Sequence, residues 1–444
     1  MISVARGWPG QLDGTVAGTV RALRDLMFGG TPPAEMTQNA RMGRNLGIHP
    51  VPAGVTHRTT MFEIFFDLVF VFALTRVITF MAGSPSAVTL AQGLLLLLLL
   101  LYSWSPYIWV GNLVRPDVGP VRAVTLVAMA AIFVAALVLP DAWQQSAQLF
   151  DAPLTLALAY VVGRAVQLVI LFWASVTNPP LRSTLRFFAV PVVLGWIPLI
   201  IGALLGGAAQ TALWTVAFLL NIGGARIAST FRPWQLRSVD HFSERFGLVL
   251  IIALGESLIS AGAGPRAMAP VGSALVAALL GLTCTVCLWW LYFDRLASAA
   301  REAVSNVPGE RRARVAGDAY GLAHSTLIIG AIYVALGIEE VIAQLTEESA
   351  HPGRLGWEAA TALYGGAALY LLSRLVFRRL TVGAVYPTQI VAGLLPLAVL
   401  PIGRSVPPLA ALTVLTALLV GVTWFERRLD GRAERPDPAQ PRLS

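Results

Sequence analysis

Residues 61–76 read Met61-Phe-Glu-Ile-Phe-Phe-Asp-Leu-Val-Phe-Val-Phe-Ala-Leu-Thr-Arg76, and this apolar stretch, which continues to about residue 82, decides the class of fold. A helix rises about 1.5 Å per residue, so about twenty apolar residues cross the roughly 30 Å hydrocarbon layer of a bilayer. Comparable stretches recur to near the end of the chain. They predict an all-α, polytopic integral membrane helical bundle of about twelve transmembrane helices, at residues 62–82, 88–110, 122–140, 153–176, 186–206, 209–225, 245–263, 270–293, 319–342, 357–377, 382–402 and 408–425.

The composition supports a membrane protein. Of 444 residues, 56% are hydrophobic and 13% are charged, whereas a soluble chain carries about a quarter charged residues. Most of the surface must therefore face lipid, and the lipid bilayer is the first predicted partner. We expect the run of eight leucines, Leu94–Leu101, to form a lipid-facing wall.

The net charge of +8 does not indicate a nucleic-acid partner, because the basic residues lie in short clusters between apolar stretches. All 32 basic residues are arginine. Without lysine the chain has neither the phosphate-binding lysine of a P-loop nor the lysine of a retinal or pyridoxal phosphate Schiff base. Motor NTPases, retinal pumps and pyridoxal phosphate enzymes are excluded within this chain.

The arginines also orient the spans. Sixteen lie in the five short connections on one side, and three lie in the six connections on the other. Because arginine accumulates in cytoplasmic loops, both ends of this multi-pass protein are predicted to be cytoplasmic. We divide the chain into a mobile cytoplasmic extension at residues 1–58, a transmembrane domain at 59–428 and a disordered cytoplasmic tail at 429–444.

Ionisable residues inside the predicted spans are the candidate functional residues, since each costs about 2.5–3.5 kcal/mol at the bilayer centre. Glu63 and Asp67 share one face of the first span. Arg164 lies at the middle of the fourth span and Glu256 near the middle of the seventh, while the ninth span carries His324.

Depth in the bilayer suggests how these groups are combined. We hypothesise that Arg164 and Glu256 neutralise each other. A second hypothesis places Glu63, Asp67 and His324 in one titratable cluster that opens toward the cytoplasm. The alternative is structural: buried ion pairs also fix helix register, and a neutral histidine also packs between helices.

No pattern of enzyme chemistry accompanies these charges. Cys284 and Cys287 are spaced as C-x-x-C but lie inside an apolar span, where small core residues are the simpler interpretation. G-x-S-x-G and H-E-x-x-H are absent. His241 and Glu244 are explained by a charged helix N-terminus. We predict no catalytic residues, no metal, no cofactor and no enzymatic activity.

Two stretches carry a family resemblance: Phe62-Glu-Ile-Phe-Phe-Asp-Leu-Val-Phe-Val-Phe-Ala-Leu74 and His241-Phe-Ser-Glu-Arg-Phe-Gly-Leu-Val-Leu-Ile-Ile-Ala-Leu-Gly-Glu-Ser257. They resemble the bacterial low-temperature-requirement A protein family. The resemblance implies a multi-spanning inner-membrane protein without an established activity, substrate or catalytic residue. It places the signature of the family at Glu63, Phe66, Asp67, His241, Glu244, Arg245, Gly255, Glu256 and His324.

Two functions remain open. The first is a secondary transporter, proton-coupled in one version, built from two six-helix halves. Asp67 or Glu256 would be its coupling carboxylate, and Arg164 would lower the pKa of that group or bind an anionic substrate. This function predicts a water-filled cavity that reaches Asp67 or Glu256. The second is a scaffold or regulatory protein for adaptation of the envelope to cold, which predicts a closed bundle. The substrate, a small molecule or an ion, and the oligomeric state are not determined by the sequence.

Overall fold

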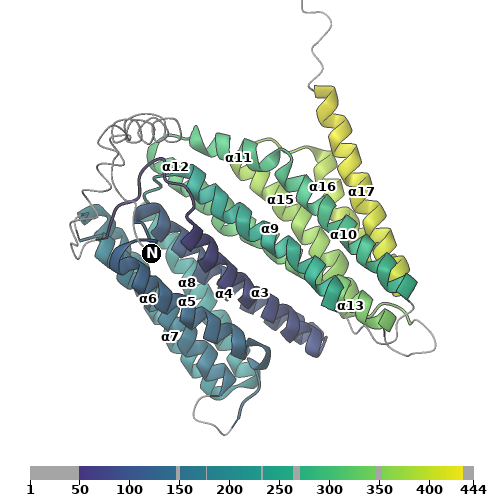
Figure 1. The fold of residues 1–444 in the computed structure, drawn as a ribbon, viewed down its shortest axis with the longest axis horizontal. Helices are drawn as coiled ribbons and strands as arrows, with labels where there is room; N and C mark the ends of the chain where they lie inside the picture. The colour runs from purple at the N-terminus through teal and green to yellow at the C-terminus, as the bar shows by residue number, and fades with distance from the viewer. Residues whose placement is uncertain are drawn as a thin grey trace, which may run out of the picture. The chain divides into compact units, whose positions relative to one another are not determined.

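The computed structural model describes residues 50–146, 151–176, 178–231, 234–263, 271–346 and 353–433. This part of the chain is helical, without β-strands apart from an isolated bridge between Pro52 and Val114. Its first group of helices (Figure 1) is α3 (Met61–Gly83), α4 (Ala87–Leu113), α5 (Gly119–Val138) with the 3₁₀ turn η1 (Leu139–Asp141), α6 (Ala152–Ala174), α7 (Pro179–Leu205) and α8 (Gly207–Phe231).

The second group begins with α9 and ends with α17. Its members are α9 (Val239–Ala263), α10 (Val271–Phe293), α11 (Leu296–Ser305), α12 (Gly309–Ala316), η2 (Gly317–His324), α13 (Ser325–Thr346), α14 (Trp357–Ala360), η3 (Thr361–Gly365), α15 (Gly366–Thr381), α16 (Pro387–Ser405) and α17 (Pro408–Ala433). Here η2 and η3 are π-helical segments that continue directly into α13 and α15.

Eleven helical segments in the described residues are long and apolar enough to cross a membrane. They coincide with eleven of the predicted spans, which confirms a multi-pass helical membrane protein. The remaining predicted span, 245–263, is the seventh in chain order and coincides with α9, which has 25 residues. Helix α7 begins seven residues before the predicted span, because Asn178 caps it by accepting a hydrogen bond from the Leu181 amide.

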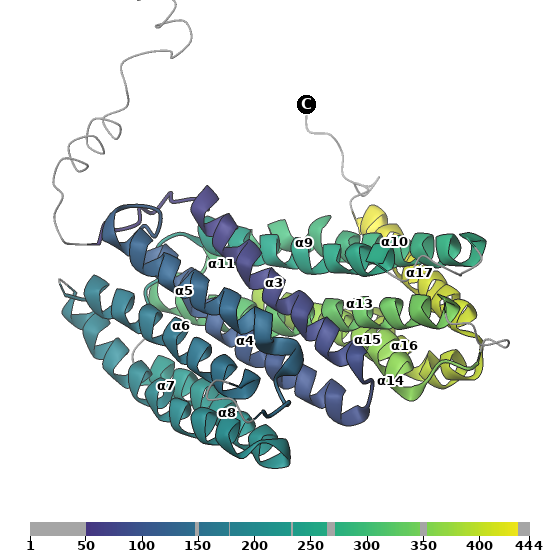
Figure 2. The same cartoon turned by 60° about the horizontal axis from the view of Figure 1, so that its bottom comes forward.

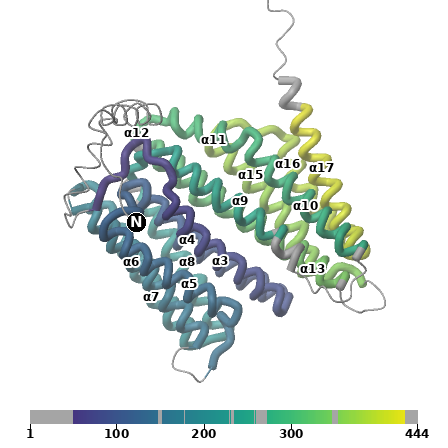
Figure 3. The backbone as a smooth tube through the Cα atoms, in the orientation of Figure 1, coloured from purple at the N-terminus to yellow at the C-terminus, as the bar shows by residue number. Residues whose placement is uncertain are grey.

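The two groups of helices meet along α3, α4, α9 and α13. Helix α3 contacts α4 and α5 in its own group, and α9 and α13 in the other. Helix α4 contacts α6 and α8 as well as α9 and α13. The backbone trace in Figure 3 shows α3 and α9 running in the middle of the bundle, and a second view shows α13 near them (Figure 2).

The run of leucines in α4 does not face lipid, so this prediction was wrong. Six of the eight are buried: Leu95, Leu96, Leu97, Leu99, Leu100 and Leu101. The reason is the position of α4, which is packed against helices of both groups. A helix that is apolar on all sides is expected at such a central place.

Glycines allow α13 and α15 to pack at close range. A Cβ atom added to Gly330 would lie 2.6 Å from the Tyr370 amide nitrogen, and one added to Gly366 would lie 2.8 Å from the Val334 nitrogen. A Cβ on Gly337 would lie 2.6 Å from the backbone of Leu363. Small residues at such contacts let two helix backbones approach, which favours packing between helices in a membrane.

The ends of the predicted transmembrane domain differ from the sequence boundaries. Residues 50–58 lie against the end of α4: the Ala53 amide donates to the Leu113 carbonyl at 3.0 Å, and the Arg115 amide donates to the Val51 carbonyl at 2.8 Å. Helix α17 extends to Ala433, into the segment predicted as a tail. The rest of the predicted extension, residues 1–49, and residues 434–444 lie outside the described residues.

The glycine contact makes a first prediction. Gly330→Ala should lower the free energy of unfolding by about 1–3 kcal/mol, as an added methyl group does in a tightly packed core. Gly421→Ala is the matched control, because a Cβ there meets no atom within 4 Å. Thermal unfolding in detergent measures both variants. Equal unfolding temperatures for Gly330→Ala and the wild type would contradict this account of the α13–α15 contact.

Candidate functional site

Glu63 is fixed in the first turn of α3 by a capping box. The Glu63 amide donates to Thr60 Oγ1 at 3.3 Å, and the Thr60 amide donates back to Glu63 Oε2 at 3.0 Å. This reciprocal pair satisfies two amides that a helix start leaves free. It also turns the carboxylate toward the helix N-terminus, where its side chain is 2% exposed.

Asp67 lies one turn further along α3 and is fully buried. Its carboxylate accepts a hydrogen bond from Trp104 Nε1 at 2.7 Å. It also forms a two-point ion pair with Arg245 of α9, in which Nε lies 3.1 Å from Oδ2 and Nη2 contacts Oδ1. Two parallel charge-assisted hydrogen bonds are the strongest form of this interaction.

Arg245 also reaches Glu63, so one guanidinium serves both carboxylates. Its Nη1 lies 3.5 Å from Glu63 Oε1 and 3.4 Å from the carbonyl of Tyr107. The ring of Phe66 lies under the guanidinium, with the centroid 5.8 Å from Cζ. The family resemblance identified Arg245 and Phe66 as signature positions, but the contact between Arg245 and Glu63 was not predicted.

His241 completes the contact between α3 and α9. Ser238 caps α9 by accepting a hydrogen bond from the His241 amide at 3.2 Å, which sets His241 in the first turn. Its Nε2 lies 2.8 Å from Glu63 Oε1, and its Nδ1 lies 3.5 Å from Asn112 Nδ2. The His241 side chain is fully buried. The interpretation from the sequence, a charged residue at a helix N-terminus, therefore does not describe its surroundings.

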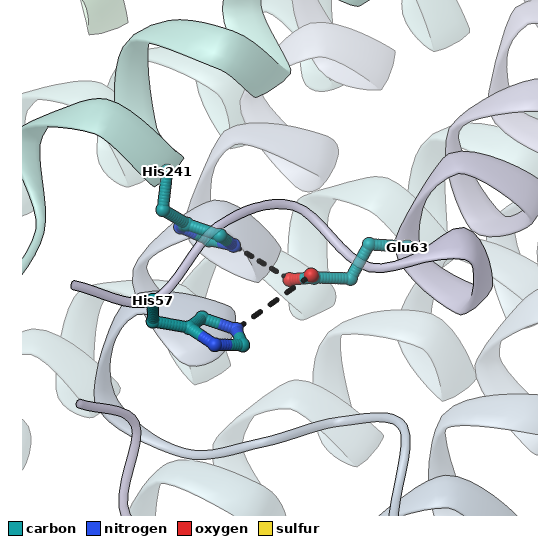
Figure 4. Close-up of side chains that lie close together, drawn as sticks. All are labelled: His57, Glu63 and His241. Atoms are coloured by element: carbon teal, nitrogen blue, oxygen red, sulfur yellow. Dashed lines mark hydrogen bonds and ion pairs between the residues drawn. The ribbon is translucent and has the colours of Figure 1, made fainter. Parts of the chain in front are cut away.

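The chain before α3 folds over this contact and adds His57. The backbone carbonyl of His57 accepts a hydrogen bond from Ser238 Oγ at 2.8 Å. The Nε2 atom of the His57 ring lies 3.9 Å from Glu63 Oε2 (Figure 4). Burial lowers the pKa of His57, and the nearby His241 lowers it further, while Glu63 acts in the opposite direction. His57 was not among the predicted site residues, because it precedes the first predicted span.

Two further signature residues of α9, Glu244 and Gly255, have simpler surroundings. Glu244 is partly exposed; its Oε1 accepts from Arg58 Nη1 at 3.2 Å and its Oε2 accepts from the Thr59 amide at 3.3 Å. These bonds hold the segment before α3 against α9. A Cβ on Gly255 would meet no atom within 4 Å, so packing within the described residues does not require a glycine there.

The predicted pair of Arg164 and Glu256 does not form. Arg164 is 1% exposed; its Nη1 donates to Gln167 at 2.6 Å, and its Nε has no hydrogen-bond partner in the described residues. Glu256 accepts from Thr75 Oγ1 at 2.8 Å. The reason lies in the packing: α6 packs against α4, α5 and α7, and α9 packs against α3, α4, α10 and α13, so that both touch α4 but are not packed against each other.

His324 does not join Glu63 and Asp67 either, so the predicted three-residue cluster is wrong. It ends the π-helical segment η2, and neither ring nitrogen has a hydrogen-bond partner in the described residues. Its imidazole lies among four aromatic rings whose centroids are 5.1 to 5.9 Å away, those of Phe246, Tyr292, Tyr320 and Phe377. His324 is therefore a packing residue in this arrangement.

Arg164 instead lines a cavity of about 110 Å³ between the first group of helices and the α12–η2 segment. The walls are aromatic and cationic: Tyr102, Trp109, Phe188, Trp234, Arg226 and Arg314. At the opposite end Arg226 forms an ion pair with Asp318, and a wider hollow of about 360 Å³ is lined by Arg226, Arg314 and Asp318. Neither Asp67 nor Glu256 is among the lining residues of these two hollows.

A helical bundle of this length and apolarity, with charged groups buried between its helices, is a multi-pass α-helical membrane protein. The sequence model of the bacterial low temperature requirement A protein family matches residues 58–424, and the chain belongs to that family.

The chain is also similar to an uncharacterized protein of Rhizobium meliloti (strain 1021). The two are 28% identical over 334 residues, which is 72% of this chain and 76% of the relative. No solved structure matches.

The buried ion pair makes a second prediction. Arg245→Met should destabilise the protein by about 3–5 kcal/mol, because it leaves Asp67 buried without its partner. Arg58→Met is the control, since Arg58 is 71% exposed in its pair with Glu244 and such pairs contribute about 0–1 kcal/mol. Unfolding in detergent, followed by circular dichroism, compares the two. Similar losses in both variants would show that the Asp67–Arg245 pair adds little.

Proposed function

We propose that this chain is a secondary transporter for a small anionic molecule, with Arg164 at its binding site. The observation that carries the proposal is a buried arginine that lines a cavity and has no carboxylate partner in the described residues. A charge inside a membrane domain is expensive unless it is paired. A bound anion would supply the missing charge.

The walls of the cavity support an anion with an apolar body. Arg164, Arg226 and Arg314 provide three positive charges, and Asp318 provides one negative charge. Because Asp318 is paired with Arg226, the excess positive charge lies on Arg164 and Arg314. The rings of Tyr102, Trp109, Phe188 and Trp234 would contact the apolar part of the ligand.

The proposed topology has twelve spans in the bacterial inner membrane, with α9 as the seventh and both ends in the cytoplasm. The alternation of arginines between successive connections supports it. The six long helices α3–α8 and the six long segments from α9 onward would be the two halves. Arg226 and Arg314 lie on arginine-rich connections of the cytoplasmic side, so the cavity would open inward.

Glu256 is the better candidate for coupling transport to protons. Asp67 is held by Arg245 and Trp104, which stabilise its charged form. Glu256 is 3% exposed and has Thr75 as its hydrogen-bond partner, without a cationic partner among the described residues. A carboxylate without a fixed counter-charge takes up and releases a proton more readily.

The scaffold function keeps two observations in its favour. The cavity that transport predicts at Asp67 or Glu256 is not found in the described residues, since neither residue lines the two hollows described above. Glu63, Asp67, His241 and Arg245 form a closed network that requires no substrate, as expected for groups that fix helix register. It does not account for the unpaired Arg164. We further propose that the chain is not an enzyme, since Asp318, the carboxylate that lines the cavity, is held in an ion pair with Arg226.

Transport is tested with the purified chain in proteoliposomes on a solid-supported membrane. Small aliphatic and aromatic carboxylates and phosphates are applied with and without a pH gradient. At least one should evoke a current, and Arg164→Gln should weaken its apparent affinity about ten- to hundred-fold, the loss expected for a charge-assisted hydrogen bond. Glu256→Gln should retain binding but lose transport driven by the pH gradient.

The matched control is Arg404→Gln, which removes an arginine that contacts Trp357 away from the cavity. It should transport like the wild type. If no compound evokes a current, or if Arg164→Gln responds like Arg404→Gln, the proposal is wrong.

A further inference from the structure

Three side chains of types that bind metals converge beside the start of α3, two of them close together in the sequence and the third far from both. They are His57 from the preceding segment, Glu63 from α3 and His241 from α9 (Figure 4). One ligand atom from each lies within 4.8 Å of the other two. The two imidazole rings have centroids 5.0 Å apart, and both present Nε2 to the carboxylate of Glu63.

We propose that His57, Glu63 and His241 bind a divalent transition-metal ion of the zinc class. Two imidazole nitrogens and one carboxylate oxygen are a ligand set that suits Zn²⁺ and its first-row neighbours. Three protein ligands leave a fourth position for water or for a group of a ligand. The site is independent of the Arg164 cavity and of transport.

The first argument is the state of His57. Its side chain is 11% exposed, and its Nε2 is buried without a hydrogen-bond partner in the described residues. A buried polar atom left unpaired costs about 1–3 kcal/mol. A structural role for Glu63 and His241 needs their mutual hydrogen bond alone and leaves this nitrogen unexplained. A metal ion between the three groups would be its partner.

The second argument is that several elements build the site. The segment carrying His57 is fixed by hydrogen bonds from Ser238 Oγ to the His57 carbonyl and from Arg237 Nη1 to the Ala53 carbonyl. Gly111 of α4 provides the space: a Cβ there would lie 2.2 Å from Glu63 Oε1 and 3.2 Å from His241 Nε2. A side chain at this position would fill the site.

Metal binding requires shifts of about half an ångström in opposite directions, with His57 moving toward Glu63 and His241 moving away from it. Two ligands about 2.0–2.1 Å from a tetrahedral metal lie about 3.3–3.4 Å apart, and His57 Nε2 now lies 3.9 Å from Glu63 Oε2. The 2.8 Å hydrogen bond between His241 and Glu63 would be replaced. A proton on His241 Nε2 would leave as the metal binds, because metal ligands must be deprotonated.

Arg245 does not prevent Glu63 from binding a cation. Its two-point contact is with Asp67, whose charge it balances, while its distance to Glu63 Oε1 is 3.5 Å. The carboxylate of Glu63 therefore retains negative charge for a cation. Its Oε2 still accepts two hydrogen bonds from Thr60, at 3.0 Å each, which orient the group from the side of the helix start.

The proposal is tested with Co²⁺ and Zn²⁺ on the full chain, purified in detergent without a histidine tag. We expect one Co²⁺ per chain with the visible absorption of a nitrogen- and oxygen-ligated site. Zn²⁺ should displace it and raise the unfolding temperature. His57→Ala should weaken Zn²⁺ binding at least about 100-fold, more than the loss of an outer-shell partner.

His57→Ala is the informative variant, because His57 Nε2 makes no hydrogen bond that folding depends on. Without metal it should unfold close to the temperature of the wild type, because removal of the unpaired nitrogen offsets the lost packing of the ring against His241. The double variant His49→Ala with His351→Ala removes two histidines that are not among the three proposed ligands and should bind metal normally. The proposal is overturned if the wild type binds neither ion, or if His57→Ala binds as tightly as this control.

Discussion

The arrangement of the bundle depends on one guanidinium that is shared by two carboxylates. Arg245 of α9 pairs with Asp67 and reaches Glu63, both on α3, in surroundings that exclude water. Charges buried in this way are tolerated where the geometry is close and the remaining hydrogen bonds are made. The contact therefore fixes both the rotation and the axial position of α3 against α9, and with them the junction between the two groups of helices.

The spans were predictable from the sequence because their signal is local. Length and apolarity decide whether a segment crosses a membrane, and the spacing of Glu63 and Asp67 correctly placed them on one face. Their partners were not predictable, since Arg245 lies 178 positions after Asp67. The pairing of Arg164 with Glu256 was inferred from depth alone. Depth says nothing about which helices are neighbours, and α6 and α9 share α4 as a neighbour but are not packed against each other.

The leucines of α4 show a second limit of sequence patterns. In a soluble protein an apolar side chain is expected to be buried, but in a membrane both lipid and protein interior are apolar. Hydropathy therefore could not distinguish a lipid-facing wall from a central helix. Polar side chains in such a helix are more informative than leucines. Trp104 and Asn112 of α4 mark where it meets α3 and α9.

Arg245 and Arg164 are two buried arginines with different surroundings, and α4 lies between them. Tyr107 of α4 accepts a hydrogen bond from Arg245 through its carbonyl, and its hydroxyl donates to the carbonyl of Gly163, next to Arg164. Pro106, which lines the cavity, interrupts the helix hydrogen bonds at this point and so permits bending. A bend in α4 that widens the cavity would shift both hydrogen bonds of Tyr107. In the proposed transporter, the ion pair at Asp67 would hold one side of α4 in place while Arg164, on the other side, responds to a bound anion.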